Sequence, residues 1–443
     1  MDISDYIKMR DKEDTAAYHA ARNADRTAGK RPAPGTDPNP LHGPQPNENN
    51  QQISFSVSHD LKWGCPICPE KDDISRATLN PNLSRCSACR VVYYCSPEHQ
   101  AADRPTHKTF CKRIQKATFV LEKEEAALKA HKAKRGSPNP FNTKTDDVWK
   151  NEVARKYMLS GKEVVLEMIR INTKTALEKA LEIIDALTKM SYKDPMGLRC
   201  ITPFLLIRLG QDQECYSLCE WWVIEGNHSN YDWRNPVVMQ NHMKEDSNVF
   251  DSVKRFTKVR DYRTKVHQYN PPSVSDLSHL VAVTLVKIRA RWGLLATRNC
   301  KVETFQDHVC ANLVWNNPKI KIRELEDCIP LINELEEHIT KLYIAVDGMN
   351  PHFWPALLNP GDHLTAVPNQ VHWGSVEEMQ KTLQECYNAW AETEGAIGLI
   401  RELSDIAIGE DRKVAALSPE EYEAERARFL GSERSKRPMP EPW

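Results

Sequence analysis

CPIC at residues 65–68, CSAC at residues 86–89 and CSPEHQAADRPTHKTFC at residues 95–111 place eight cysteine and histidine side chains in one short stretch. Structural zinc sites take four thiolate or imidazole ligands in a tetrahedron. Two C-x-x-C pairs followed by C-x-x-x-H and H-x-x-x-C therefore predict two structural zinc ions. The candidate ligands are Cys65, Cys68, Cys86, Cys89, Cys95, His99, His107 and Cys111.

The order and spacing of these ligands resemble the MYND zinc-finger family, most closely downstream of Cys86. The resemblance is carried by the YYC sequence after the second C-x-x-C pair, by C-x-x-x-H-Q and by H-x-x-x-C. In that family the ligands of two zinc ions interleave along the chain. The resemblance thus implies one site of Cys65, Cys68, Cys95 and His99, and a second site of Cys86, Cys89, His107 and Cys111.

Three features depart from the family pattern. Cys68 and Cys86 are separated by 17 residues, which is longer than usual and polar enough to loop out. His99 stands where the family most often has cysteine, and Arg104 stands where it commonly has tryptophan. Gln100 is retained, so the resemblance implies that Gln100 and Arg104 take part in partner binding. In family members that bind proline-rich peptides the tryptophan helps to line the groove, so its replacement by Arg104 implies weaker binding of such peptides.

Each site would hold three thiolates and one neutral imidazole around Zn²⁺, a formal charge of −1. Four basic residues are placed to compensate this charge in part: Arg85, Arg90, Lys108 and Lys112. Both ligand sets are complete, which favours structural over catalytic zinc because no position is open for water. So short a segment has little apolar core, and metal binding would supply about 10 kcal/mol or more per site. We therefore expect the metal-free finger to be unfolded.

The rest of the chain is predicted to be mainly α-helical. A helix is expected over 112–135, projecting from the finger, since this segment has strong helix formers and no proline or glycine. The predicted organisation is a disordered region at 1–59, the finger with its trailing helix at 60–135, a linker at 136–146, an all-α domain at 147–430 and a disordered tail at 431–443.

Within the all-α domain, apolar residues recur at helical spacing. The clearest pattern is Leu277, Leu280, Val281, Leu285, Ile288, Trp292 and Leu295, on a helix that Ser273 or Ser275 would cap. Other helices are expected at 175–191, 196–210, 212–226 with Asp212 as cap, 320–346, 375–404 and from Ser418 onward. The helices beginning near 173 and 211 weakly resemble tetratricopeptide packing.

The body also resembles the helical C-terminal region of a group of fungal MYND-finger proteins. The residues that carry this resemblance are 201–222, 279–289 and 356–400. It implies a shared architecture but no particular activity.

The composition of the chain disfavours several classes of protein function. A formal net charge of −1 disfavours a generally basic nucleic-acid binder. Neither a run of about 18 apolar residues nor the apolar core of a signal peptide is present, so we expect no membrane span and an intracellular, reducing location for the 13 cysteines. The cysteine pair Cys215 and Cys219 and the tryptophan pair Trp221 and Trp222 are predicted to be core residues.

The MYND resemblance implies a non-enzymatic protein-interaction module or adaptor, often in transcriptional settings, with other proteins as partners and no small-molecule substrate. A MYND-containing SET-type lysine methyltransferase is the first alternative, but its motifs are approached only by GNHSN at 226–230 and RNC at 298–300. A RING-like ubiquitin ligase fits the ligand order less well. Nucleic-acid binding by the helix at 112–135 is disfavoured by Glu122, Glu124 and Glu125. No P-loop, dinucleotide fingerprint, G-x-S-x-G or H-E-x-x-H motif occurs.

Overall fold

The computed structural model describes residues 61–62, 64–68, 83–135, 147–191, 194–226, 247–257, 276–299, 314, 317 and 328–415. Several predictions fall outside these residues and are not tested by them. They are the disordered region at 1–59, the linker at 136–146, the caps Ser273 and Ser275, the helix from Ser418 and the tail at 431–443.

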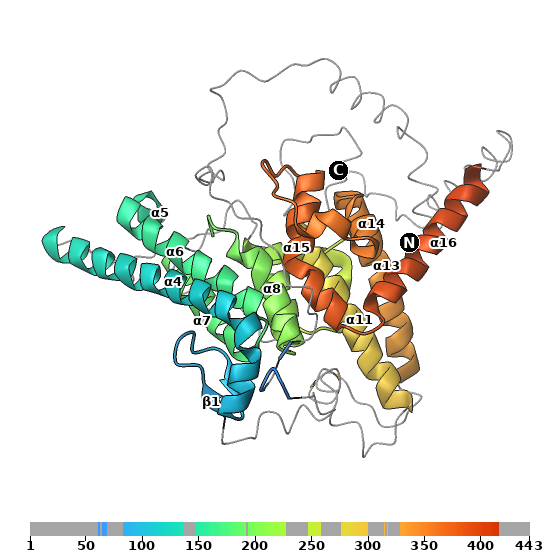
Figure 1. Ribbon diagram of the computed structural model, residues 1–443. Coiled ribbons are helices and arrows are strands. Elements are labelled where there is room, and N and C mark those ends of the chain that lie inside the picture. The colour runs from blue at the N-terminus through green and yellow to red at the C-terminus, as the bar shows by residue number, and fades with distance from the viewer. Residues whose placement is uncertain are drawn as a thin grey trace, which may run out of the picture.

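The described residues are mainly helical, as predicted, with one small antiparallel hairpin in the finger (Figure 1). The hairpin pairs β1 (Ser84–Arg85) with β2 (Tyr93–Tyr94). The long helices are α4 (Pro97–Arg135), α6 (Glu152–Ile171), α7 (Lys174–Met190), α8 (Leu198–Arg208), α9 (Asp212–Trp221), α11 (Leu277–Asn299), α13 (Cys328–Met349), α15 (Val376–Glu392) and α16 (Ala396–Ala415). Shorter helical segments are α5 (Asp147–Lys150), η1 (Trp222–Gly226), η2 (Val253–Arg255), α14 (Phe353–Leu358) and η5 (Gly361–Leu364).

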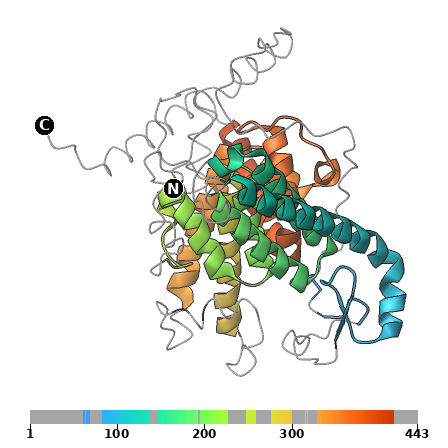
Figure 2. The ribbon, with the colours of Figure 1, turned by 90° about the vertical axis from the view of Figure 1, so that its left-hand side faces the viewer.

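Helix α4 differs from the predicted trailing helix at 112–135. It begins inside the finger at Pro97 and continues without interruption to Arg135. Its later part does not stand away from the body but packs lengthwise on α6, with Ile114, Ala117 and Leu128 buried. The helix changes direction between these two parts (Figures 1 and 2). Pro105 cannot donate a backbone hydrogen bond to the preceding turn, which permits such a bend.

The buried apolar side chains form two cores. One core joins finger residues to α4, α6, α7 and part of α8, so it spans both sides of the predicted linker. The other joins α8, α9, α11 and α13–α16. Helix α8 serves both, because Leu198, Ile201 and Leu205 face the first core while Phe204 and Ile207 face the second.

Helix α11 lies at the centre of the second core. The predicted apolar face is buried or half-buried, but the other faces are buried too, including Ser278, His279, Thr284, Lys287 and Arg289. The sequence pattern indicated only one packing face of this helix, because the polar residues break the apolar pattern on its other faces. Their polar atoms must find partners inside the protein, and Arg289 does so by donating to the carboxylate of Asp212 at 2.5 and 3.0 Å.

Two predictions about helix ends are corrected. Asp212 is the first residue of α9 and its side chain binds Arg289, so it does not cap the helix. The helix expected at 375–404 is two helices, α15 and α16, which meet at a break over Thr393–Gly395. The break follows from Gly395, which has a φ of 75°, a left-handed conformation that glycine adopts at little cost. Other predictions are confirmed, since Cys215, Cys219, Trp221 and Trp222 are buried core residues.

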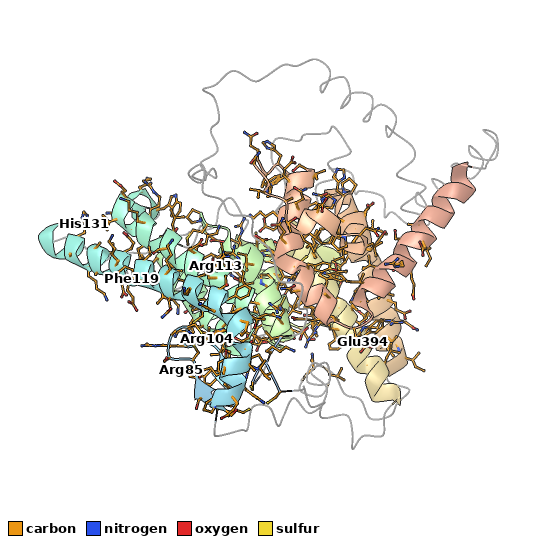
Figure 3. All side chains as sticks on the ribbon, in the orientation of Figure 1. Arg85, Arg104, Arg113, Phe119, His131 and Glu394 are labelled. Atoms are coloured by element: carbon orange, nitrogen blue, oxygen red, sulfur yellow. The ribbon has the colours of Figure 1, made fainter. Side chains whose placement is uncertain are left out.

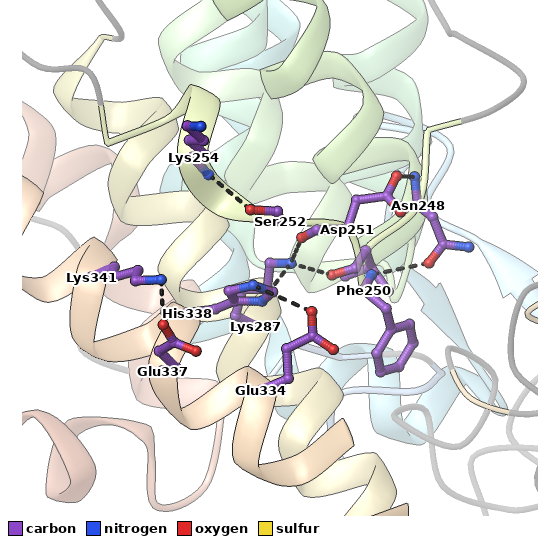
Figure 4. A network of polar contacts seen from close by, with 11 residues as sticks. Asn248, Phe250, Asp251, Ser252, Lys254, Lys287, Glu334, Glu337, His338 and Lys341 are labelled. Atoms are coloured by element: carbon purple, nitrogen blue, oxygen red, sulfur yellow. Dashed lines mark hydrogen bonds and ion pairs between the residues drawn. The ribbon is translucent and has the colours of Figure 1, made fainter. Parts of the chain in front are cut away.

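Lys287 ties the 247–257 segment to the second core (Figure 4). Its Nζ donates to the backbone oxygens of Val249 and Asp251, both at 2.6 Å, and lies 3.5 Å from Nδ1 of His338. Burial lowers the pKa of Lys287 to about 7, and burial likewise lowers the pKa of His338 to about 4. A neutral amine suits this position because its two hydrogens match the two carbonyl acceptors.

Lys287→Met tests this burial. An unfolded lysine has a pKa near 10.4, so between about pH 7 and pH 10 the unfolded state binds more protons than the folded state. The unfolding free energy of the wild type should therefore rise relative to that of the variant as the pH increases from 7 to 9.5, and the difference should be flat below pH 7. Chemical denaturation at each pH measures it, with Lys179→Met, at an exposed position of α7, as control. A difference that does not change with pH above 7 would show that Lys287 stays charged.

Candidate metal centre

The finger's backbone brings the first ligand set together from three separated segments. Cys65 and Cys68 close a turn in which Cys68 N donates to the Cys65 oxygen at 3.2 Å. Cys95 follows β2 directly, and His99 lies in the first turn of α4. Ser96 precedes the helix and its Oγ accepts from His99 N at 3.3 Å, which fixes the start of α4 beside the site.

The second ligand set joins the hairpin to α4. Cys86 and Cys89 lie in the turn after β1, where Cys86 N donates to Val92 O at 2.9 Å and Arg90 N donates to Cys86 O at 3.0 Å. Arg90 has a φ of 62°, so the turn places a non-glycine residue in the left-handed region. His107 and Cys111 are four residues apart on α4, so both point to the same side of the helix.

Within each set the ligand atoms lie at the edges of a zinc-sized tetrahedron. In the first set, Cys68 Sγ is 3.4 Å from Cys95 Sγ, while His99 Nδ1 is 3.1–3.6 Å from the three sulfur atoms. In the second, Cys86 Sγ is 3.9 Å from Cys111 Sγ and Cys89 Sγ is 3.6 Å from His107 Nε2. Zn–S and Zn–N bonds of about 2.3 and 2.0 Å give edges of about 3.8 Å between sulfurs and 3.5 Å between sulfur and nitrogen. The residues therefore fit two zinc ions.

The geometry also excludes the main alternative for these cysteines. A disulfide requires sulfurs about 2.05 Å apart, far closer than the separations in either set. All six finger cysteines are free thiols. The grouping is the interleaved one that the MYND resemblance implied, since Cys65, Cys68, Cys95 and His99 converge at one place and Cys86, Cys89, His107 and Cys111 at another.

The thiols of one set oppose one another's ionisation. Burial disfavours the Cys65 thiolate, but hydrogen bonds from the backbone of Cys95, Ile67 and Cys68 bring its pKa down to about 6. Burial and the neighbouring thiols of Cys95 and Cys65 raise the pKa of Cys68 to about 12. Burial and the charges of Cys86 and Cys111 likewise raise the pKa of Cys89 to about 12. A divalent cation at the centre of each set would remove this repulsion, which is the electrostatic reason for the sites to hold metal.

The two sites differ in burial. The ligands of the first set are all partly exposed, whereas those of the second are all buried. Beside the second set, Tyr94 is 1% exposed, donates to Asp103 Oδ2 at 2.7 Å and contacts the ring of His107 edge-on at 6.0 Å. This arrangement holds the ligand-bearing turn of α4 against β2.

Contacts that the sequence did not indicate attach the finger to the helical body. Thr173, the N-cap of α7, donates from Oγ1 to Val91 O at 2.7 Å. Lys62 forms a parallel bridge with Thr173, through Lys62 N to Asn172 O at 3.0 Å and Lys174 N to Lys62 O at 2.9 Å. Arg113 of α4 pairs with the buried Glu167 of α6 at 2.8 Å. The only sequence signal for this contact surface was a threonine in N-cap position before residues 174–190.

The predicted partner-binding residues do not belong to the metal sites. Gln100 and Arg104 lie on α4 about one turn apart, and both side chains are exposed. Figure 3 labels Arg104 at the finger part of α4. The residues expected to offset the charge of the sites, Arg85, Arg90, Lys108 and Lys112, are exposed as well.

Comparison with known proteins agrees with this geometry. The family model of the MYND finger matches residues 65–111, a range that begins and ends on zinc ligands. Residues 65–111 are therefore a MYND finger, a zinc-binding module of protein–protein interactions. The chain is also similar to the Rho GTPase-activating protein gacZ of Dictyostelium discoideum, with 30% identity over 81 residues, which is 18% of this chain and 6% of that protein.

No solved structure matches the chain. Among the described helices, none is long and apolar enough to cross a membrane. Of the approximate SET motifs, GNHSN lies outside the described residues beyond Gly226, as does Cys300 of RNC.

Metal removal should affect more than the finger. Because the second ligand set belongs to the same core as α6 and α7, Cys111→Ser should unfold the finger and also expose the amides of these two helices to exchange. Cys65→Ser, in the partly exposed first set, should perturb the finger but leave most of the protection in α6 and α7. Hydrogen exchange read by mass spectrometry measures both variants, with α13 in the other core as internal reference.

A chelator should reproduce the effect of Cys111→Ser, and the NMR signals of the metal-free finger should collapse to those of an unfolded chain. Retention of the finger's ordered signals in the chelator would contradict a metal-dependent fold.

Proposed function

We propose that this protein is a non-enzymatic, intracellular adaptor whose MYND finger binds other proteins, with transcriptional regulation as one setting for it. The observation that carries the proposal is that α4 bears two kinds of residue. The helix supplies three of the eight candidate zinc ligands and packs on the body, while Gln100 and Arg104 on the same helix are exposed and belong to neither ligand set.

The attachment of the finger to the body supports an adaptor in particular. A finger on a flexible tether would present its surface in many orientations, whereas this one shares a core with α6 and α7 and is hydrogen-bonded through Thr173. Two full ligand sets leave no coordination position for a substrate or for water, which favours a scaffolding role for the metal.

Affinity capture from cell extract with the full-length protein tests the proposal. Gln100→Ala should remove a defined subset of protein partners while leaving the fold and the zinc content unchanged, because Gln100 is exposed and is no ligand. Gln370→Ala, which truncates an exposed glutamine of the loop before α15, is the matched control and should lose none.

Cys95→Ala, which removes a ligand of the first set, should lose at least the partners that Gln100→Ala loses. An identical partner set for the wild type, Gln100→Ala and Cys95→Ala would show that docking depends on the helical body and would overturn the proposal. Tight binding of S-adenosylmethionine, measured by calorimetry, would instead favour the methyltransferase.

A further inference from the structure

A line of basic residues with one exposed phenylalanine runs along α4 beyond Pro105. We call Lys108, Lys112, Lys116, Phe119 and Lys123 the basic stripe. Their spacings of 4, 4, 3 and 4 residues place them on one helix face, over about 22 Å of its length. All five side chains are exposed, and Phe119 is 67% exposed. Figure 3 shows Phe119 on the part of α4 that extends beyond the finger.

Packing fixes this face toward solvent. Ile114, Ala117 and Leu128 are buried on the opposite side of α4, and Arg113 pairs with Glu167 of α6. The helix cannot rotate to cover Phe119 without exposing these residues. The body therefore holds the basic stripe in a fixed line.

The acidic residues of α4 do not neutralise the stripe. Glu124 and Glu125 are partly buried on other faces, and Glu125 pairs with Lys129. Glu122 lies at the edge of the stripe. Within the described part of the chain, none of the four stripe lysines is in an ion pair. The sequence of this helix contains both acidic and basic residues, but the face that the basic stripe presents to solvent is cationic.

We propose that the basic stripe binds an acidic, amphipathic helix of a partner protein. Carboxylates four residues apart on such a helix are spaced by about 6 Å along its axis, the same interval as Lys108, Lys112 and Lys116. An apolar side chain between them would cover Phe119, which otherwise remains in water. This inference rests on the proposed function and deepens it by naming the chemical class of the partner.

The shape of the stripe favours a helix over a broader anionic surface. It is a single file of residues, whereas a nucleic-acid duplex or an anionic bilayer presents charge across its width and would also meet Glu122. The stripe follows Arg104 by one turn, so a partner seated on the finger's exposed residues would continue along α4.

A display library of helix-forming 20-residue peptides, randomised at every second or third position, tests the proposal against the full-length zinc-loaded protein. Enriched peptides should carry Asp or Glu at i, i+4 spacing with an apolar residue between them. Enrichment of peptides without this acidic pattern, or no enrichment over an unrelated bait, would overturn it.

Fluorescence anisotropy with an enriched peptide then assigns the binding face. The triple variant Lys108→Gln, Lys112→Gln, Lys116→Gln should weaken binding about tenfold or more and flatten its salt dependence, because three exposed ion pairs are lost. Phe119→Ala should weaken binding without changing the salt dependence. The matched control, Lys156→Gln, Lys179→Gln, Lys189→Gln, has the same net charge and neutralises exposed lysines of α6 and α7, and it should bind like the wild type.

Equal weakening by both triple variants would show a general charge effect and overturn the proposal. So would tighter, stripe-dependent binding of a single-stranded RNA 20-mer or of phosphatidylserine vesicles than of the peptide. If Gln100→Ala loses natural partners while the stripe variants bind the peptide like the wild type, the proposed function stands and this inference fails.

Discussion

The structure depends on the rigidity of one helix, α4, which takes part in both predicted metal sites and in the body at once. It supplies His99 to the first ligand set and His107 and Cys111 to the second, then packs lengthwise on α6. Because a continuous helix fixes the relative positions of its side chains, metal binding and docking to α6 are not independent. The bend beyond the finger part, permitted by Pro105, allows one helix to satisfy both sets of contacts.

Because of this coupling, the finger is not an independent folding unit but shares a hydrophobic core with the helical body. A MYND finger of this size has little apolar core of its own, and here Cys86, Cys89, Val91, Val92 and Tyr94 join a core that the body completes. Glu167 carries the coupling further, because it is buried and pairs with Arg113 of α4 and with Arg170 of its own helix. Separating the finger from α6 would break the pair between Arg113 and Glu167 and leave Arg170 as the remaining partner of this buried carboxylate, so the pair with Arg113 favours the docked arrangement.

Polar side chains inside the body link helices that are far apart in the sequence. Arg208, at the end of α8, donates to Glu392 of α15 at 2.7 and 2.9 Å and also to Asn172, whose backbone oxygen holds Lys62. A series of hydrogen bonds thus connects Lys62, just before the finger, to Asn172 in the turn between α6 and α7, and from there to Glu392 at the end of α15.

The sequence alone determined the eight candidate ligands and the helical class, because cysteine and histidine spacing and apolar periodicity are local properties. The grouping into two interleaved sets came from the family resemblance, and the structure brings the same eight residues together in those two sets. Tertiary structure decided what depends on residues distant in sequence. Thr173 binds Val91, Asp212 binds Arg289 instead of capping α9, and α11 buries Lys287 among partners contributed by two other segments. Likewise, Glu124 and Glu125 made α4 appear mixed in charge, and only its packing on α6 showed which face remains in solvent. Such pairings are set by which surfaces the folded chain brings together, and no local pattern records them.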